Sequence, residues 1–273
     1  MLAEEAGLAR ILAGGTDVLV QLKSGLVEPD LIVDIKNIAG MRAITSEAGG
    51  YRIGAAVSGA ELGEHEGVAA LWPGVVEAFE LIGSTQVQGR ATMAGNLCNG
   101  SPAADSVPGL MAAGAVARIA GPTGERDCPV EAIPAGPGRT TLAKGEFITS
   151  IFLPSRSARS SDAYLRFIPR TEMDIAVASA AVSLTLDAGG VVTQARVAIG
   201  AVAPTVRLVA PAAEAIVGTK LEEPALASLA AACSAAANPI DDKRGTIEYR
   251  THVVGVLARR AAVIASNRAG GRK

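Results

Sequence analysis

One stretch in the first half of the chain, residues 83–105, cannot fill a hydrophobic core. It reads GSTQVQGRATMAGNLCNGSPAAD, so almost every residue is small or forms hydrogen bonds. Apolar segments with helical spacing lie on either side of it, at 75–82 and 106–113. Glycines let the backbone approach a ligand closely, and successive free N–H groups in such a loop can hold an anion. The stretch therefore predicts a ligand-binding loop, with an ordinary long surface loop as the alternative.

A shorter glycine loop lies near the start of the chain. Residues 9–13 predict a short buried strand that stops at Gly14-Gly15, and Thr16 takes the N-cap position of a following helix. A strand, a glycine turn and a helix start form a natural phosphate site, although a plain strand-to-helix turn is the alternative. Asp17 would repel a phosphate, so its side chain is expected to face away or to bond elsewhere.

Three short motifs in these two loops together resemble a known family. Residues 13–17 read Ala-Gly-Gly-Thr-Asp, residues 92–96 read Thr-Met-Ala-Gly-Asn, and residues 101–105 read Ser-Pro-Ala-Ala-Asp. At this separation they resemble the FAD-binding subunit of molybdenum-containing hydroxylases, the family of carbon monoxide dehydrogenase medium subunits and the flavin domain of xanthine dehydrogenase. The resemblance covers nearly the whole chain.

The fold that this resemblance implies is α/β plus α+β. It implies an FAD-binding domain of the PCMH (vanillyl-alcohol-oxidase-like) type over residues 1–155, then a smaller α+β C-terminal domain of the CO dehydrogenase flavoprotein type over residues 162–268. The order of predicted elements agrees. Alternating strands and helices, with a capping box that begins at Ser58 and a strand at 147–153, precede two long β-prone runs that flank a hairpin signal at 187–190, and a set of helices follows. Residues 154–162 are polar and predict a flexible connection. The family has one more strand-and-helix unit before the first loop, so the start of the chain is expected to be truncated.

The resemblance also implies that FAD is the cofactor and that the protein holds it without a catalytic residue or a metal ligand, since the cofactor carries the chemistry. Its diphosphate is expected against the two loops, with Asp105 and Arg166 beside the flavin ring. The alternatives are a helix cap for Asp105 and a solvated side chain for Arg166. The residues expected to bind FAD are Leu12, Ala13, Gly14, Gly15, Thr16, Asp17, Val18, Leu19, Thr92, Met93, Ala94, Gly95, Asn96, Asp105, Ile148 and Arg166.

Single residues in or near the second loop lead to further expectations. Ala94 replaces the first glycine of the family's Gly-Gly pair, and it would cost about 1 kcal/mol if that position needs a positive φ. Cys98 predicts a small buried thiol rather than a reactive one. His65 and His252 are expected to have no catalytic role.

Composition argues against several other classes of protein. A net charge of −2 and an aromatic content of 3% predict no basic face and no stacking platform for nucleic acid. Three widely spaced cysteines and two histidines give no pattern for an iron–sulfur cluster or a zinc site. The chain shows neither a signal peptide nor a run of roughly twenty apolar residues, so a cytoplasmic protein without a membrane span is expected.

The function that the resemblance implies is electron transfer within a multi-subunit oxidoreductase. In the family, a small [2Fe–2S] subunit receives electrons from a large molybdopterin-binding subunit and passes them to the FAD subunit, which delivers them to NAD⁺, a quinone or oxygen. Two alternatives are a self-contained flavin oxidoreductase and a non-catalytic interaction protein that has lost FAD, the second suggested by Ala94 and by the shortened start of the chain. The sequence has neither a Gly-x-Gly-x-x-Gly dinucleotide fingerprint nor a phosphate loop that ends in Gly-Lys-Ser/Thr.

Overall fold

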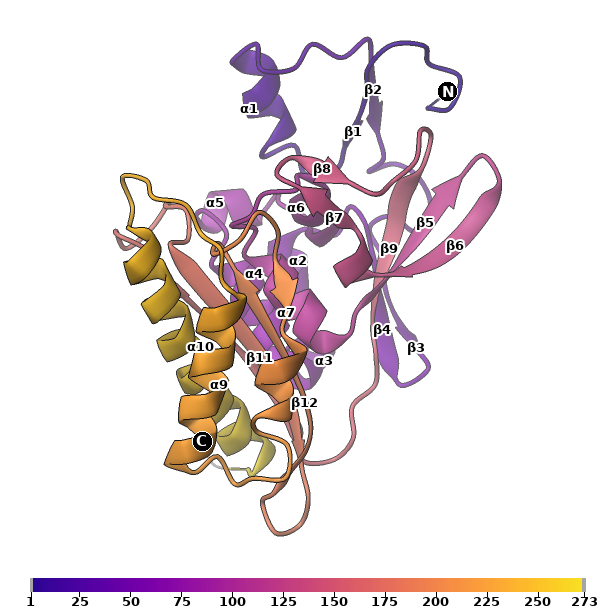
Figure 1. The fold of residues 1–273 in the computed structure, drawn as a ribbon. Helices are drawn as coiled ribbons and strands as arrows, with labels where there is room; N and C mark the ends of the chain where they lie inside the picture. The colour runs from indigo at the N-terminus through magenta and orange to yellow at the C-terminus, as the bar shows by residue number, and fades with distance from the viewer. Residues whose placement is uncertain (1, 272–273) are drawn as a thin grey trace.

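The computed structural model describes residues 2–271, which form two parts with separate hydrophobic cores (Figure 1). The N-terminal part ends with a strand that stops at Leu153, and the C-terminal part begins with a strand at Ser160. Phe79 is among the largest buried side chains of the first core, and Leu229 is fully buried in the second. Among the described residues, no helix is long and apolar enough to cross a membrane.

A parallel pair of strands forms the top of the molecule in Figure 1. Strand β1 (Ala9–Leu12) pairs with β2 (Leu31–Asp34), and helix α1 (Val18–Lys23) connects them. The predicted first strand is present, but it is half-buried rather than buried. The predicted cap is wrong by one residue: Asp17 is the N-cap of α1, because Thr16 still belongs to the turn after Gly15, whose φ is 83°.

The main sheet of the N-terminal part is antiparallel, in the order β3-β4-β9-β5-β6. Its central strand, β9, coincides with the predicted run at 147–153. Glycine turns join β3 to β4 and β5 to β6 as hairpins, and β9 joins the two hairpins into one sheet by pairing antiparallel with β4 and with β5. The strands are β3 (Ile44–Glu47), β4 (Gly50–Gly54), β5 (Val116–Gly121), β6 (Gly124–Pro129) and β9 (Phe147–Leu153), with a small separate pair β7 (Pro134–Gly136) and β8 (Arg139–Thr140).

The stretch at 83–105 is not one open loop as predicted, because its small residues are compatible with two short helices. The Thr92 side chain caps the second of these helices by accepting the N–H of Gly95 at 3.0 Å. The predicted flanking helices are present, and so is the predicted capping box that begins at Ser58. The helices are α2 (Gly59–Gly63), α3 (Glu66–Leu71), α4 (Pro73–Glu80), α5 (Thr85–Gln88), α6 (Met93–Cys98) and α7 (Ser106–Ala113), with the 3₁₀ turn η1 (Val130–Ala132).

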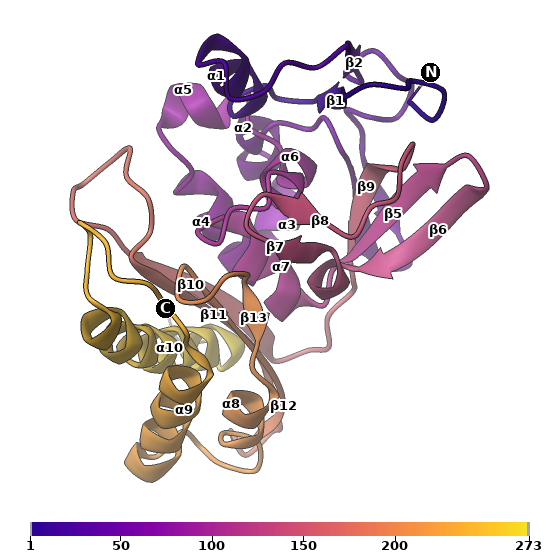
Figure 2. The ribbon, with the colours of Figure 1, turned by 45° about the horizontal axis from the view of Figure 1, so that its top comes forward.

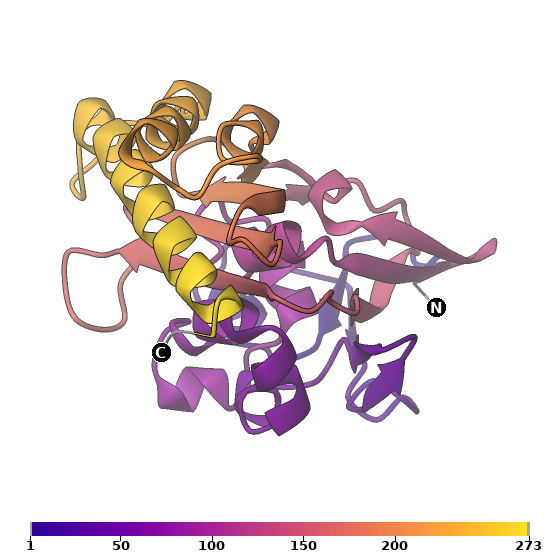
Figure 3. The same ribbon diagram turned by 90° about the horizontal axis from the view of Figure 1, so that it is seen from below.

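The C-terminal part is a four-stranded antiparallel sheet with helices on one face (Figures 2 and 3). The longest helix, α10, lies across strands β10 and β11, while the other face of the sheet packs on α4 and α7 of the N-terminal part. The predicted hairpin at 187–190 is confirmed. The elements are β10 (Ser160–Phe167), β11 (Ala178–Leu186), β12 (Val192–Gly200), β13 (Arg207–Leu208), α8 (Ala210–Glu214), α9 (Glu223–Ala236) and α10 (Ile247–Ala269).

The polar connection at 154–162 is not the flexible linker that was predicted. The Arg156 and Asp162 side chains are only 5% and 4% exposed and form an ion pair at 2.6 Å. The Arg156 guanidinium lies 3.9 Å from the ring centroid of Trp72, and the Asp162 carboxylate accepts the N–H of Val75 at 3.0 Å. Two opposite charges can be buried when each is the partner of the other. Because both side chains also contact Trp72 or Val75 of the N-terminal part, this connection fixes the two parts to each other.

Removing one member of this buried pair should destabilise the protein far more than breaking an exposed pair. Asp162→Ala leaves the Arg156 charge buried without its partner and should lower the free energy of unfolding by about 3–5 kcal/mol. Asp127→Ala is the control, because Asp127 pairs with Arg118 at an exposed position and should cost less than about 1 kcal/mol. Urea unfolding measures both values, and equal losses would contradict the interpretation.

Candidate cofactor site

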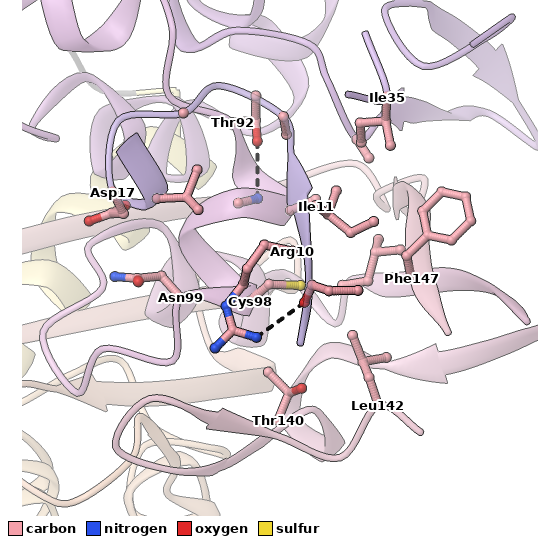
Figure 4. Close-up of a pocket in the computed structure, with 18 of the residues that line it drawn as sticks. Arg10, Ile11, Asp17, Ile35, Thr92, Cys98, Asn99, Thr140, Leu142 and Phe147 are labelled. Carbon is pink, nitrogen blue, oxygen red and sulfur yellow. Dashed lines mark hydrogen bonds between the residues drawn. The ribbon is translucent and has the colours of Figure 1, made fainter. Parts of the chain in front are cut away.

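A cavity of about 750 Å³ opens where three segments of the N-terminal part meet. Figure 4 shows side chains from each of them: Arg10 and Ile11 on β1, Cys98 on α6, and Leu142 and Phe147 just before and at the start of β9. The volume falls within the range of roughly 300–1,000 Å³ that is usual for cofactor sites. The two predicted glycine loops therefore share one cavity.

The first glycine loop lies directly against the second. A Cβ atom on Gly14 would come within 1.9 Å of the carbonyl oxygen of Arg90, so no other residue fits at this position. A second contact joins the same segments, since the Gln21 side-chain amide donates to Asn99 Oδ1 at 3.0 Å. Backbone contact thus fixes how the two loops face each other.

A row of unpaired donors runs along the first loop. Within residues 2–271, the backbone N–H groups of residues 14–18 donate to no acceptor of the protein, and all five residues line the cavity. Backbone donors of this kind need solvent or a ligand as their partner, and successive ones form an anion-binding concavity. The donor set therefore fits the diphosphate of FAD.

The rest of the cavity wall combines apolar surface with a few charges. Ile11 and Ile35 contribute apolar surface, and Arg10 points among the lining side chains in Figure 4. Glu146 also lines the cavity, but hydrogen bonds from Arg126 lower its pKa to about 2 and hold it as a carboxylate. Sequence reasoning missed Arg10 and the lining residues of the 138–147 segment, because they lie outside the glycine motifs.

Most of the residues predicted to bind FAD line this cavity. Asp17 is among them, and its carboxylate lies at the margin of the side chains drawn in Figure 4; that it faces away from a bound phosphate stays a prediction. Leu12, Leu19 and Met93 do not line it; Met93 is buried in the first core. The predicted residues at the cavity wall are Ala13, Gly14, Gly15, Thr16, Asp17, Val18, Thr92, Ala94, Gly95, Asn96 and Ile148.

The structure answers the questions raised by three single residues. Ala94 lies inside α6 and does not have a positive φ, so the penalty considered for this alanine does not arise. Cys98 lines the cavity, and burial raises the pKa of its thiol to about 12, which leaves it unreactive. His65 caps α3 by accepting the N–H of Val68 at 3.2 Å.

Asp105 and Arg166 contact each other rather than the cavity. The Asp105 carboxylate accepts hydrogen bonds from Arg166 Nη1 at 2.6 Å and from the Tyr164 hydroxyl at 2.7 Å. The Arg166 side chain is 5% exposed, so it is not solvated, and Asp105 makes no side-chain cap bond to α7. Burial raises the pKa of the Asp105 carboxyl to about 6, although Arg166 and the Tyr164 hydroxyl act in the opposite direction. The pair joins the end of the second loop to the C-terminal part, and contact of either residue with a flavin stays a prediction.

Both parts of the chain match known sequence families. Residues 1–156 match the family described as the FAD binding domain in molybdopterin dehydrogenase, and residues 163–264 match the CO dehydrogenase flavoprotein C-terminal domain. These matches and the mixed helix-and-sheet architecture confirm the predicted fold class.

Similarity to individual proteins extends over nearly the full chain. The chain is 34% identical to the carbon monoxide dehydrogenase medium chain of Afipia carboxidovorans, covering 96% of this chain and 90% of that one. It is 31% identical to the putative xanthine dehydrogenase FAD-binding subunit of Escherichia coli, covering 97% and 91%. A chain of the reconstituted CO dehydrogenase from Oligotropha carboxidovorans superimposes with a TM-score of 0.93 at 33% identity, covering 98% and 93%.

Gly14 should tolerate no side chain. Gly14→Ala forces the two loops apart and should lower the free energy of unfolding by at least about 2 kcal/mol. Gly89→Ala is the matched control, because Gly89 precedes Arg90, has a φ of −62°, and offers 3.6 Å to the nearest atom. That change should stay within about 0.5 kcal/mol of the wild type. Thermal and urea unfolding measure the stability of both variants. A Gly14→Ala variant as stable as the wild type would refute the close approach of Gly14 to Arg90.

The raised pKa of Asp105 predicts a pH dependence of stability with a definite sign. Between the usual value of 3.8 and about 6, the unfolded carboxyl ionises while the folded one keeps its proton. The wild type should therefore lose up to about 3 kcal/mol of stability relative to Asp105→Asn as the pH rises through this window. Urea unfolding of both proteins at several pH values measures this loss, and a wild type that gains stability relative to Asp105→Asn as the pH rises would show that Arg166 lowers the pKa instead.

Proposed function

The chain belongs to the family of FAD-binding medium subunits of molybdenum-containing hydroxylases, and we propose that it carries electrons from a [2Fe–2S] subunit through FAD to a terminal acceptor. It is thus a flavoprotein subunit of an oxidoreductase. The row of free N–H groups at residues 14–18, in a cavity of suitable size, is the observation that supports FAD binding most directly.

We assign different tasks to the two parts of the chain. Residues 1–155 would form the FAD-binding domain, with the diphosphate against the N–H groups of residues 14–18 and the start of α6. Bound FAD supplies the redox chemistry, and the protein supplies position and charge. Residues 162–268 would form the smaller domain, which brings Arg166 to Asp105. If the flavin ring lies beside these two residues, it meets a buried carboxylate whose charge a guanidinium already balances.

The partners and the acceptor follow from the kind of enzyme to which the relatives belong. Their names, medium chain and FAD-binding subunit, are names of parts of larger enzymes. We therefore expect a large molybdopterin-binding subunit that acts on the substrate and a small [2Fe–2S] subunit that feeds electrons to this chain. The electrons would leave to NAD⁺, a quinone or oxygen. A cytoplasmic location stays a prediction.

One observation weakens the alternative that the chain has lost FAD. That alternative relied in part on Ala94, yet Ala94 has an ordinary helical backbone inside α6 and lines the cavity with its neighbours. Its methyl group therefore replaces a glycine without backbone strain. The self-contained flavin oxidoreductase differs from the subunit in one measurable property, which is hydroxylation of a substrate without partners.

The purified chain should contain FAD and should act as an electron relay but not as a hydroxylase. Its absorption spectrum should show the two bands of an oxidised flavin. If NAD⁺ is the acceptor, NADH should reduce an indophenol or tetrazolium dye through the chain. Purines, aldehydes and carbon monoxide should not reduce the dye until the partner subunits are added. Turnover of these substrates by the chain alone would favour the self-contained oxidoreductase, and a chain without flavin affinity would refute the proposed function.

A further inference from the structure

A hydrogen-bonded connection runs from the cavity wall into the C-terminal part. Asn96, on α6, lines the cavity, and its Oδ1 atom accepts both the N–H of Ser106 at 3.2 Å and the Ser106 hydroxyl at 2.7 Å. Ser106 is completely buried at the first position of α7. Asn96 therefore supplies the cap that the preceding residue, Asp105, does not give to this helix.

This contact fixes the direction of the Asn96 amide. A backbone N–H can only donate, so the oxygen of the amide must face Ser106 and the NH₂ group must face away from it. Within the described part of the chain, Asn96 Nδ2 donates to no protein acceptor. Its two N–H donors are thus held in a defined direction by a residue that does not itself line the cavity.

The next residue along the chain connects Ser106 to the C-terminal part. Asp105 is 8% exposed and is held by the Tyr164 hydroxyl and by Arg166, both on β10. Tyr164 is 2% exposed and does not line the cavity. Strand β10 therefore holds Asp105, the residue at which α7 begins. The first residue of α7, Ser106, in turn fixes the direction of the Asn96 amide.

We propose that Ser106 and Tyr164 are positioning residues for the cofactor, which couple the contact between the two parts of the chain to FAD binding through the Asn96 amide. The proposal rests on the proposed function, since it takes FAD as the ligand of the cavity. Coupling of this kind is reciprocal, so bound FAD also strengthens the contact between the parts.

A double-mutant cycle on FAD affinity tests the connection. The full-length chain, freed of flavin, is titrated with FAD while the flavin fluorescence is followed. Ser106→Ala and Tyr164→Phe each remove one hydroxyl donor and should each weaken binding about threefold to tenfold. Because both residues act through one connection, the double variant should bind FAD clearly more tightly than the two single losses of affinity, multiplied together, predict. Effects that multiply would overturn the proposal, and so would an unchanged affinity in Tyr164→Phe.

A control variant separates this connection from contact between the parts in general. Arg196, on β12, donates to the carbonyl oxygen of Met111 at 3.0 and 2.9 Å and to Glu131 at 2.9 Å, so it also bridges the parts, but at the other end of α7. Arg196→Ala should lower stability in urea and leave the FAD dissociation constant unchanged. A loss of affinity equal to that of Tyr164→Phe would show that any weakening of the interface suffices, and would overturn the proposal.

A further variant separates the amide donors from the fold. Asn96→Asp keeps an acceptor for Ser106 but removes both Nδ2 donors, so it should weaken FAD binding by about tenfold or more while the flavin-free chain stays folded by circular dichroism. Wild-type affinity in this variant would overturn the role of the amide. If the wild type itself fails to bind FAD, the proposed function fails and the inference with it; if the wild type binds and the variants bind equally well, only the inference fails.

Discussion

The close approach of Gly14 to the carbonyl oxygen of Arg90 determines where the cavity lies. It places the first glycine loop on the segment between α5 and α6, although long stretches of sequence separate the two. Because the two loops meet backbone to backbone, neither can use its side chains to fill the space between them. The N–H groups of residues 14–18 are then left at the cavity wall without protein acceptors. The turn and the start of α1 leave these donors unpaired, the steric contact holds them against the second loop, and a ligand with anionic oxygens satisfies them.

Buried charges hold the C-terminal part in place beside this cavity. Asp162 with Arg156 and Asp105 with Arg166 lie at two separate points of the contact, and all four side chains are at least nine-tenths buried. Charges removed from water stabilise a structure little in net terms, but they penalise every arrangement in which they lose their partners. The two pairs therefore favour one relative position of the two parts over others that would bury equally apolar surface. The end of the second glycine loop is held by one of these pairs, so the cavity depends on that position.

The fold and the candidate site could be predicted to different depths. Strand β9, the capping box at Ser58 and the hairpin at 187–190 follow from local residue patterns, and local patterns predicted them correctly. The prediction of a flexible linker was wrong, because the polarity of residues 154–162 does not reveal that Arg156 and Asp162 form an ion pair in the interior. The glycine motifs identified one wall of the cavity, whereas Arg10 and Leu142 come from segments whose sequence carries no comparable signal. The buried ion pair and the far wall of the cavity depend on contacts between residues distant in sequence, and local residue patterns do not predict such contacts.

The kind of site also explains how this fold serves relatives with different names. The donor row and the steric contact between the two loops consist of backbone atoms, so both depend on chain geometry more than on side-chain identity. This chain is similar to a CO dehydrogenase medium chain and to a putative xanthine dehydrogenase FAD-binding subunit to nearly the same degree, at 34% and 31% identity, and a TM-score of 0.93 accompanies only 33% identity. A cofactor that carries the reaction needs position rather than a substrate-specific residue. Substitutions should be least tolerated at Gly14 and at the two buried pairs, where a new side chain meets a backbone atom or leaves a buried charge without its partner.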